Sequence, residues 1–372
     1  MKMKPSFRGA DWIAAAVIIA ATAGLCLLPG PAGLARDGDG RSVAATVVET
    51  DDSSLALHGL VEFGTQRLRV RLPDGSVRAA SNELRAQLEL DKKFVPGDKA
   101  IVVVPPNDDG VSPLVARDRW RTGWLFALFG SFCLLLCVFG GWTGVKALFS
   151  FVFSCLAVWK LLIPLCLRGW HASSVSFLTV AVLTAVIMYL VAGATRKGLS
   201  AFFGAMLGVF ASLALAHLFG RVMYVNGATL PYAQPLLYSG YSFLDLRDVF
   251  IGAIVLASSG AVMDLAMDIA AGVSEVKRHN SALGFRELFL SGVRMGRAVV
   301  GTMTTTLLLA YSGGYLTLLM MFASQGTRPL DFLNSTLVSA EIVKTLVGSF
   351  GLVLVAPFTA LVAAFAFRRE HS

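Results

Sequence analysis

Two carboxylates four residues apart are the strongest chemical feature of this 372-residue sequence. Asp264 and Asp268 lie within the apolar run from Val249 to Val273. Residues at positions i and i+4 project from one face of a helix. Inserting an ionisable side chain at the centre of a membrane helix costs about 2.5–3.5 kcal/mol of free energy. The presence of the pair therefore indicates a function or a specific stabilising contact. In a low dielectric, such a pair can bind a cation through its oxygens or carry a proton.

Hydroxyl groups are expected beside these carboxylates. The next apolar run carries four threonines, Thr302, Thr304, Thr305 and Thr306. If the two runs are antiparallel helices joined by a short loop, the aspartates and threonines lie at the same depth, roughly 7–13 Å from one end of the helices. Gly313 and Gly314 follow the threonines and are expected to act as a hinge. The structural alternative is that the aspartates hydrogen-bond to neighbouring helices or pair with Arg294 or Arg297.

Other chemical sites are weaker. Glu341 and Lys344 are three residues apart at the outer end of the last apolar run, and their spacing predicts an ion pair on one helix face. The sequence has no phosphate-binding loop and no HExxH zinc motif. We therefore expect no enzymatic activity, no catalytic residues, no cofactor and no metal centre.

The composition indicates which elements must hold these residues. Hydrophobic residues make up 55% of the chain and charged residues 15%, against about 25% charged in a typical soluble domain. This excludes a purely soluble enzyme and a disordered chain. The formal net charge of +8 agrees with basic loops on the cytoplasmic side of a membrane protein. Nucleic-acid binding is therefore not expected.

Runs of about 20 apolar residues are long enough to cross a bilayer as helices. The sequence predicts a membrane α-helical bundle of about eight transmembrane helices. They are Trp12–Leu28, Gly123–Gly140, Val145–Leu167, Ser173–Ala194, Leu199–Gly220, Val249–Val273, Ala298–Ala323 and Val338–Phe367. Residues 1–28 are interpreted as an uncleaved signal anchor, with cleavage near Ala35 as the alternative. The other seven helices form one domain over residues 120–372.

Basic residues predict the orientation. Alternate short loops and their edges carry Lys146, Arg196, Lys197, Lys277, Arg278, Arg286, Arg294 and Arg297. Because such loops remain in the cytoplasm, both termini are expected to be cytoplasmic and residues 36–119 extracytoplasmic. The expected location is the cytoplasmic membrane.

Residues 36–119 are polar and predict a small β-rich domain, either OB-like or another barrel. Expected strands are Val43–Glu49, Gln66–Leu72, Val77–Ala80 and Ala100–Val104, with a short helix over Ser81–Leu88. Strict alternation from Arg67 to Leu72 and the turn residues that follow indicate a hairpin. The domain is either a spacer or a module that binds a partner or ligand. A second local expectation is an amphipathic helix over Gly284–Gly296 on the cytoplasmic membrane surface.

Three blocks of the sequence resemble the YibE/F-like membrane protein family. They are GAVMDLAMDIAAGVSEV at 260–276, GRAVVGTMTTTLLLAY at 296–311 and EIVKTLVGSFGLVLVAP at 341–357. The resemblance covers most of the chain after Ser42. It implies a bacterial multispanning membrane protein with a small extracytoplasmic domain, and a permease as the activity.

Two functions follow from these observations. The first is a secondary transporter or permease in which Asp264 and Asp268 bind an ion or proton beside the threonines. The second is a non-transporting membrane scaffold whose outer β-domain recruits a partner in the envelope. Besides the lipid bilayer, the expected partners are an unidentified ion or small molecule and either a homo-oligomer or a partner membrane subunit.

Overall fold

The computed structural model describes residues 22–25, 27 and 40–368. The chain divides into two compact units, one of residues 32–139 and the other of residues 1–31 and 140–372. Each unit is described by itself. The predicted signal anchor, Trp12–Leu28, falls almost entirely outside the described residues.

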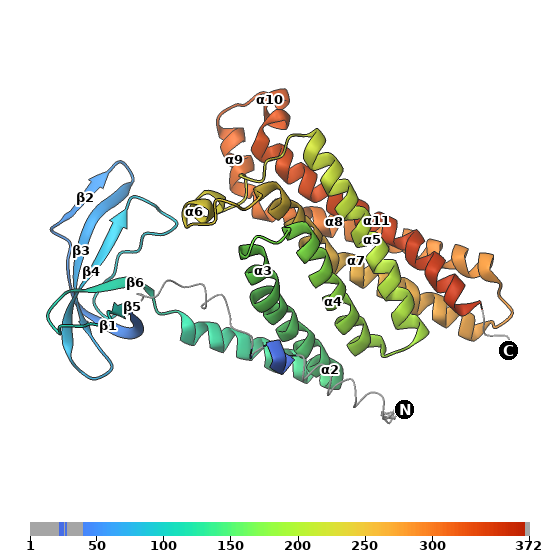
Figure 1. The fold of residues 1–372 in the computed structure, drawn as a ribbon, viewed down its shortest axis with the longest axis horizontal. Helices are drawn as coiled ribbons and strands as arrows, with labels where there is room; N and C mark the ends of the chain where they lie inside the picture. The colour runs from blue at the N-terminus through green and yellow to red at the C-terminus, as the bar shows by residue number, and fades with distance from the viewer. Residues whose placement is uncertain (1–21, 26, 28–39, 369–372) are drawn as a thin grey trace. The chain divides into compact units, whose positions relative to one another are not determined.

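The first unit contains a closed barrel of five strands (Figure 1). The strands of the unit are β1 (Arg41–Asp51), β2 (Leu55–His58), β3 (Val61–Arg71), β4 (Val77–Arg85), β5 (Lys99–Val104) and β6 (Leu114–Arg119). Around the barrel the order is β1-β5-β6-β4-β3, and β1 closes the ring by pairing with β3. All of these pairs are antiparallel except β4 with β6. Strand β2 adds only to β3, at the outside of the ring.

Alternating side chains fill the barrel. Leu68 and Val70 of β3 are buried, whereas the arginines at 67, 69 and 71 that alternate with them are exposed, as the alternation predicted. The predicted helix over Ser81–Leu88 is wrong, because Ser81 and its neighbours continue β4 to Arg85 and pair with β3. Cross-strand pairing, which local composition does not reveal, decides this segment.

A buried amide network fastens the loop after β4 to the barrel. The side chain of Gln66 donates to the Phe94 carbonyl at 2.8 Å and accepts from the Phe94 N–H at 3.0 Å. Asn82 donates to the Gln66 side chain at 3.1 Å and to the Lys92 carbonyl at 2.6 Å. Both amide residues are almost completely buried, so these bonds satisfy groups that water cannot reach.

Long helices form the second unit, and α2, the first of them, begins within the first unit in sequence. They are α2 (Thr122–Ala157), α4 (Ala172–Ala192), α5 (Arg196–Val222), α7 (Leu246–His279), α8 (Phe285–Gly314) and α11 (Thr336–Phe367). Shorter helices are η2 (Val158–Leu162), α3 (Ile163–Leu167), α6 (Ala233–Tyr238), α9 (Leu316–Ser324) and α10 (Pro329–Asn334). Gly141, with φ 53° and ψ −131°, interrupts the helical backbone of α2. This break lies between the second and third predicted spans.

The segment from Phe285 to Gly314 differs from its prediction. Residues 284–296 do not form a separate surface helix; they are the first half of α8, which continues without a break to Gly314. Small residues on this half lie against other helices. A Cβ at Gly292 would be 2.8 Å from the Cβ of Ala360, and one at Gly296 would be 2.6 Å from that of Ala356. The apolar side of the amphipathic pattern therefore packs inside the bundle.

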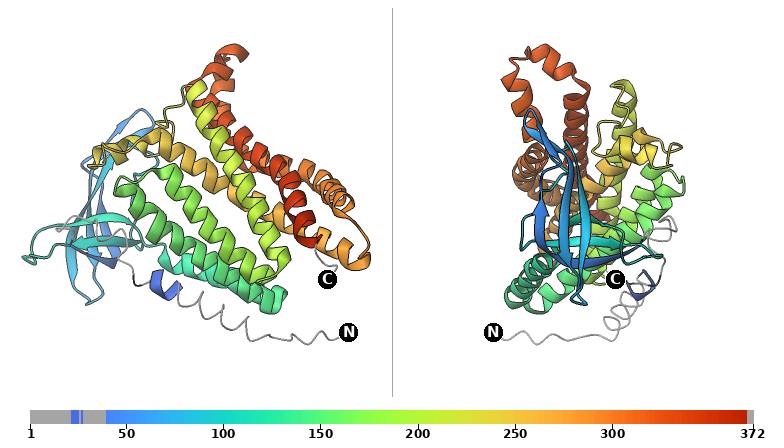
Figure 2. Two further views of the ribbon diagram at one scale, coloured as in Figure 1. Left: turned by 45° about the vertical axis from the view of Figure 1, so that its right-hand side comes forward. Right: turned by 90° about the vertical axis from the view of Figure 1, so that its left-hand side faces the viewer.

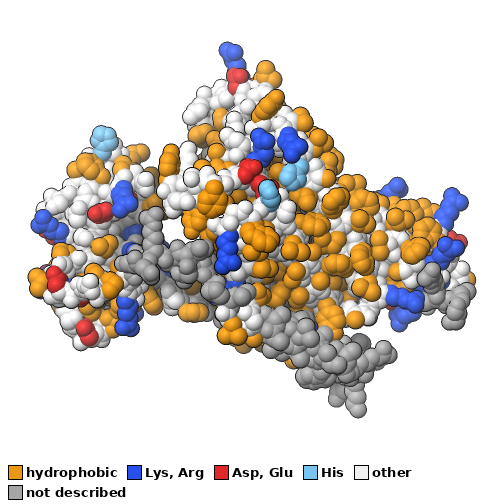
Figure 3. Space-filling view, viewed as in Figure 1, with side chains coloured by type: hydrophobic (Ala, Val, Ile, Leu, Met, Phe, Trp, Pro, Cys, Tyr) orange, Lys and Arg blue, Asp and Glu red, His pale blue; other side chains and the backbone are white. Residues whose placement is uncertain are grey.

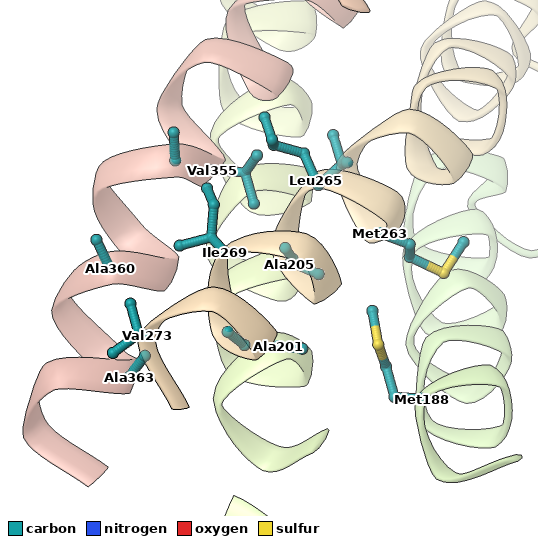
Figure 4. Close-up of a cluster of buried hydrophobic side chains, with 14 of the residues drawn as sticks. Met188, Ala201, Ala205, Met263, Leu265, Ile269, Val273, Val355, Ala360 and Ala363 are labelled. Carbon is teal, nitrogen blue, oxygen red and sulfur yellow. The ribbon is translucent and has the colours of Figure 1, made fainter. Parts of the chain in front are cut away.

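Small residues bring α5, α7, α8 and α11 together. Gly204 and Gly208 of α5 meet Thr359 and Val355 of α11, in the close approach that a GxxxG step allows. Figure 2 shows α5 and α8 beside α11. In Figure 4, Leu265, Ile269 and Val273 of α7 point among residues of α5 and α11. On the other side of α7, Met263 lies opposite Met188 of α4.

Five described helices are long and apolar enough to cross a membrane, or six if α8 and α9 count as one bent span. The stretch Thr122–Leu167 counts as one in this total, although the sequence predicts two spans there. Hydrophobic side chains cover much of the visible face of the helical unit (Figure 3). These observations define a multi-pass membrane protein, while the predicted total of eight spans stays a prediction.

Candidate functional site

The face of α7 that carries Asp264 and Asp268 is left uncovered by the other described helices. Both residues are exposed, while their neighbours Met263, Leu265 and Ile269 are buried. The exposed stripe continues along α7 through Ala257 and Gly260 toward one end, and through Glu275 toward the other. The helical repeat places these positions on one side. The two carboxylates therefore share a face that α4 and α8 flank and do not fill.

The packing of α7 on α8 sets which residues are level with the aspartates. A Cβ at Gly272 of α7 would lie 3.2 Å from Cε of Met295, and one at Gly296 of α8 would lie 3.3 Å from Cδ1 of Ile269. Because the helices run in opposite directions, moving back along α7 means moving forward along α8 at 1.5 Å per residue. By this count Asp268 is level with residues 297–299, and Asp264 with residues 301–303, which include Thr302.

The threonine hydroxyls are not bonded to the aspartates. Those of Thr302, Thr305 and Thr306 donate to carbonyls one turn back in α8, at 2.9–3.0 Å. Thr304 differs, since its hydroxyl oxygen is buried and has no hydrogen-bond partner among the described residues. A hydroxyl that donates to its own helix keeps lone pairs for another ligand. Thr302 thus offers an acceptor oxygen at the level of Asp264 without a hydrogen bond to it, whereas Thr304, Thr305 and Thr306 lie further along α8.

The structural alternative, in which the aspartates bond to neighbouring helices or pair with Arg294 or Arg297, is not what the described residues show. Within the described part of the chain, neither aspartate has a hydrogen bond or ion pair, including with Arg294 or Arg297. Nor is there any group of three or more His, Cys, Asp or Glu side chains in metal-binding proximity among the described residues. The two carboxylates could supply only part of a cation's oxygen ligands, with hydroxyls or a partner supplying the rest.

Gly313 and Gly314 are the last two residues of α8. The next residue, Tyr315, leaves helical geometry, and α9 then departs at 65° to α8. A Cβ at either glycine would meet nothing within 4 Å. The chain therefore bends directly after this glycine pair, and no neighbouring side chain lies close to the backbone there.

Glu341 and Lys344 form an ion pair near the start of α11. The Lys344 ammonium also lies over the ring of Tyr311 of α8, 5.8 Å from its centroid. Tyr311 reaches across to Gly348, where an added Cβ would be 3.3 Å from its hydroxyl oxygen. The contribution of Tyr311 to this cluster was not predicted, because only the register of α8 against α11 brings the two together.

Two further charged residues, which were not predicted to belong to the site, fasten α7 at its ends. Asp248, in its first turn, accepts a hydrogen bond from the Ser173 N–H of α4 at 3.2 Å. At the other end, the buried ammonium of Lys277 donates to the carbonyls of Ser281 and Leu283, at 2.7 and 3.1 Å. These bonds hold the α7–α8 turn and the α4–α7 contact in place, and so position the aspartate face.

The barrel unit has a groove of about 480 Å³ between β4, β6 and the loop after β4. Its lining mixes acidic and basic side chains, including Glu83, Arg85 and Lys92. Asp91 closes part of it by accepting the N–H groups of Arg85 and Gln87 at 2.7–3.0 Å. Desolvation raises the pKa of Asp91, but the backbone N–H groups outweigh it, and the net pKa is lowered.

Together the apolar helices and the charged residues set within them define an integral membrane protein of the multi-pass class. The family model for YibE/F-like protein matches residues 128–369. The chain belongs to this family, as the resemblance of the three sequence blocks indicated. No curated protein matches the chain, and no solved structure does.

Proposed function

We propose that this protein is a secondary transporter or permease in which Asp264 and Asp268 bind an ion or a proton. The observation that carries the proposal is the uncovered face of α7, where two carboxylates four residues apart have no protein partner in the described chain. Carboxylates within a membrane span face a bundle interior, a cavity or a partner rather than lipid. An ion pathway along this face would give them such an environment.

The surrounding residues support the same function. Thr302 is level with Asp264 and keeps lone pairs that a cation could use. The bend after Gly314 would allow α9 to move relative to α8 as the face opens or closes. We further propose the orientation that basic loops favour, with both termini cytoplasmic and the barrel outside the inner membrane. The aspartates then lie in the cytoplasmic half of the bundle.

The test is ligand-dependent stability of the purified full-length protein in detergent. Thermal unfolding is measured with gluconate salts of Li⁺, Na⁺, K⁺ and Mg²⁺, and across a range of pH. A bound ion should raise the unfolding free energy by about 2.7 kcal/mol at one hundred times its Kd. Asp264→Asn, Asp268→Asn and the double variant should lose this increase.

Glu275→Gln is the matched control, because Glu275 lies on the same face of α7 but already pairs with Arg278. This variant should keep the wild-type ion response. If the aspartate variants also keep it, or if no cation and no pH change alters the stability of the wild type, the assignment of the site is wrong.

A membrane scaffold is the second candidate, and the barrel groove is the observation that favours it. A groove lined by both charge signs suits a protein or peptide surface with alternating charges. Charge reversal at Arg85 and Lys92, on the groove, should then abolish function while Asp264→Asn/Asp268→Asn leaves it unchanged. The opposite pattern favours the permease. Reversal of Arg69, an exposed residue of β3 outside the groove, is the control.

A further inference from the structure

Unpartnered buried oxygens gather at the contact of α8 with α11. Among the described residues, the buried side-chain atoms without a hydrogen bond are in Ser212, Thr304, Tyr311, Glu341, Thr345 and Thr359. Tight helix packing accounts for two of them, because Ser212 lies against Gly351 and Thr359 against Gly204. Four remain. Thr304 lies two turns before Tyr311 on α8, whereas the other three are grouped at Lys344: Glu341 pairs with it, the Tyr311 ring faces it and Thr345 follows it in α11. Buried polar groups in proteins nearly always have a hydrogen-bond partner, so these three atoms call for one.

These residues converge through helix spacing and one interhelical contact. Glu341, Lys344, Thr345 and Gly348 are at positions i, i+3, i+4 and i+7 of α11, and so share one face. Tyr311 of α8 covers that face at Lys344 and Gly348. The hydroxyl of Thr345, a residue that is only 4% exposed, has no acceptor in the described chain. The cluster therefore contains an ammonium and two hydroxyl groups free to donate.

Its chemistry selects an anion over a cation. Lys344 supplies a fixed positive charge and three N–H donors, and each hydroxyl supplies one more donor. A metal cation would be repelled by Lys344. Among the described residues, the anion at the site is the carboxylate of Glu341, which contacts Lys344 but accepts no well-oriented hydrogen bond at its Oε2. Glu341 thus occupies the position that a free anion would take.

We propose that Tyr311, Lys344 and Thr345 form a binding site for a small anion, a halide or a carboxylate group, and that the Glu341 carboxylate is its built-in competitor. The side chains of Glu341 and Lys344 are 24% and 22% exposed, so the pair can be reached from outside the bundle core. An arriving anion displaces the carboxylate from Lys344 and accepts hydrogen bonds from the two hydroxyls. This site is separate from Asp264 and Asp268 and does not rest on their proposed role.

The test uses purified full-length protein and N-methylglucamine salts, so that no small cation is present. Thermal unfolding is measured against chloride, bromide and formate, with gluconate as the anion too large for the site. Radioactive chloride binding gives the affinity directly. The wild type should be stabilised by the small anions and not by gluconate. Lys344→Met should abolish the effect, Lys344→Arg should retain it, and Tyr311→Phe or Thr345→Val should weaken binding about three- to tenfold.

Glu341→Gln separates this proposal from a purely structural ion pair. If the carboxylate competes with the anion, its removal should tighten chloride binding at least tenfold. If the pair is only structural, Glu341→Gln and Lys344→Met should destabilise the protein alike, and neither should change an anion response; that result would overturn the proposal. Should Glu341→Gln fail to fold, Glu341→Asp, which shortens the reach to Lys344, should tighten binding in the same direction, and unchanged or weaker binding contradicts the proposal.

Two controls isolate the site. Asp331→Asn removes an exposed charge from α10 next to the start of α11, and it should leave anion binding unchanged. Asp264→Asn/Asp268→Asn should also leave it unchanged. Loss of the anion response in either control would show that general charge, rather than this cluster, governs it.

Discussion

Gly204 of α5 lies directly against Thr359 of α11: a Cβ added to Gly204 would come within 2.7 Å of the Thr359 Cα. The obstructing atom belongs to the backbone, so a rotamer change cannot relieve the contact. Both residues are buried in the centre of the helical unit. The close approach of α5 and α11 thus depends on the absence of one methyl group.

Gly204→Ala should destabilise the protein by about 1–3 kcal/mol, because the two helices must separate to admit the methyl group. Thermal unfolding in detergent measures the change. Gly301→Ala is the matched control, since Gly301 is also helical and a Cβ there would meet nothing within 4 Å. The control should be neutral or slightly stabilising. Equal losses in the two variants would contradict the packing role of Gly204.

The two aspartates should act as one unit. If they bind a single ion, Asp264→Asn and Asp268→Asn should each remove nearly the whole ion-dependent rise in melting temperature. The double variant should then lose no more than either single variant, because residues that share a ligand are not additive. Additive losses would indicate two independent carboxylates.

The amide network of the barrel should govern the loop after β4. Gln66→Leu leaves the Phe94 backbone and the Asn82 side chain without their partners, and each buried unpaired group costs about 1–3 kcal/mol. Hydrogen–deuterium exchange at residues 92–94 should speed up at least tenfold. Gln87→Leu, an exposed residue of the same loop, should have no such effect. Unchanged exchange in Gln66→Leu would mean that other contacts hold the loop.

Acid should loosen the loop between β5 and β6. The Ser112 hydroxyl, followed by the N–H groups of Ser112 and Val111, lowers the pKa of Asp109 from 3.8 to about 2. Because the folded state favours the ionised form, this contribution is complete above pH 3.8 and is lost as the pH falls through about 2. Pepsin cleavage within residues 105–113, normalised to a reference peptide, should rise over that interval.

Asp109→Asn should already show fast cleavage of the loop at pH 4, with little further change on acidification. A wild-type rate that stays flat from pH 4 to pH 2 would show that the Asp109 bonds do not hold the loop closed.

Local patterns predicted much of the barrel. Alternation from Arg67 to Leu72 located β3, and Pro73 to Ser76 located the turn into β4. The same method failed at Ser81–Leu88, where composition permits a helix but the pairing of β4 with β3 imposes a strand. Pairing is a relation between segments, and no local window contains it.

The candidate site could likewise be predicted from the sequence only in part. Spacing alone places Asp264 and Asp268 on one face of α7, since it depends only on the helical repeat. The face left open and the distance to the threonines depend on how α4, α7 and α8 pack. Likewise, the meeting of Tyr311 with Lys344 follows from the register of α8 on α11, which depends on small residues such as Gly292 and Gly296.

The unbroken course of α8 has a mechanical consequence. The helix is about 45 Å long by its residue count. It contacts α7 through Met295 and α11 through Tyr311. A tilt of α8 at its contact with α7 would therefore move the Tyr311 ring that lies over Lys344. The face with Asp264 and Asp268 and the cluster at Lys344 would then be mechanically coupled through the rigidity of α8, although they share no residue.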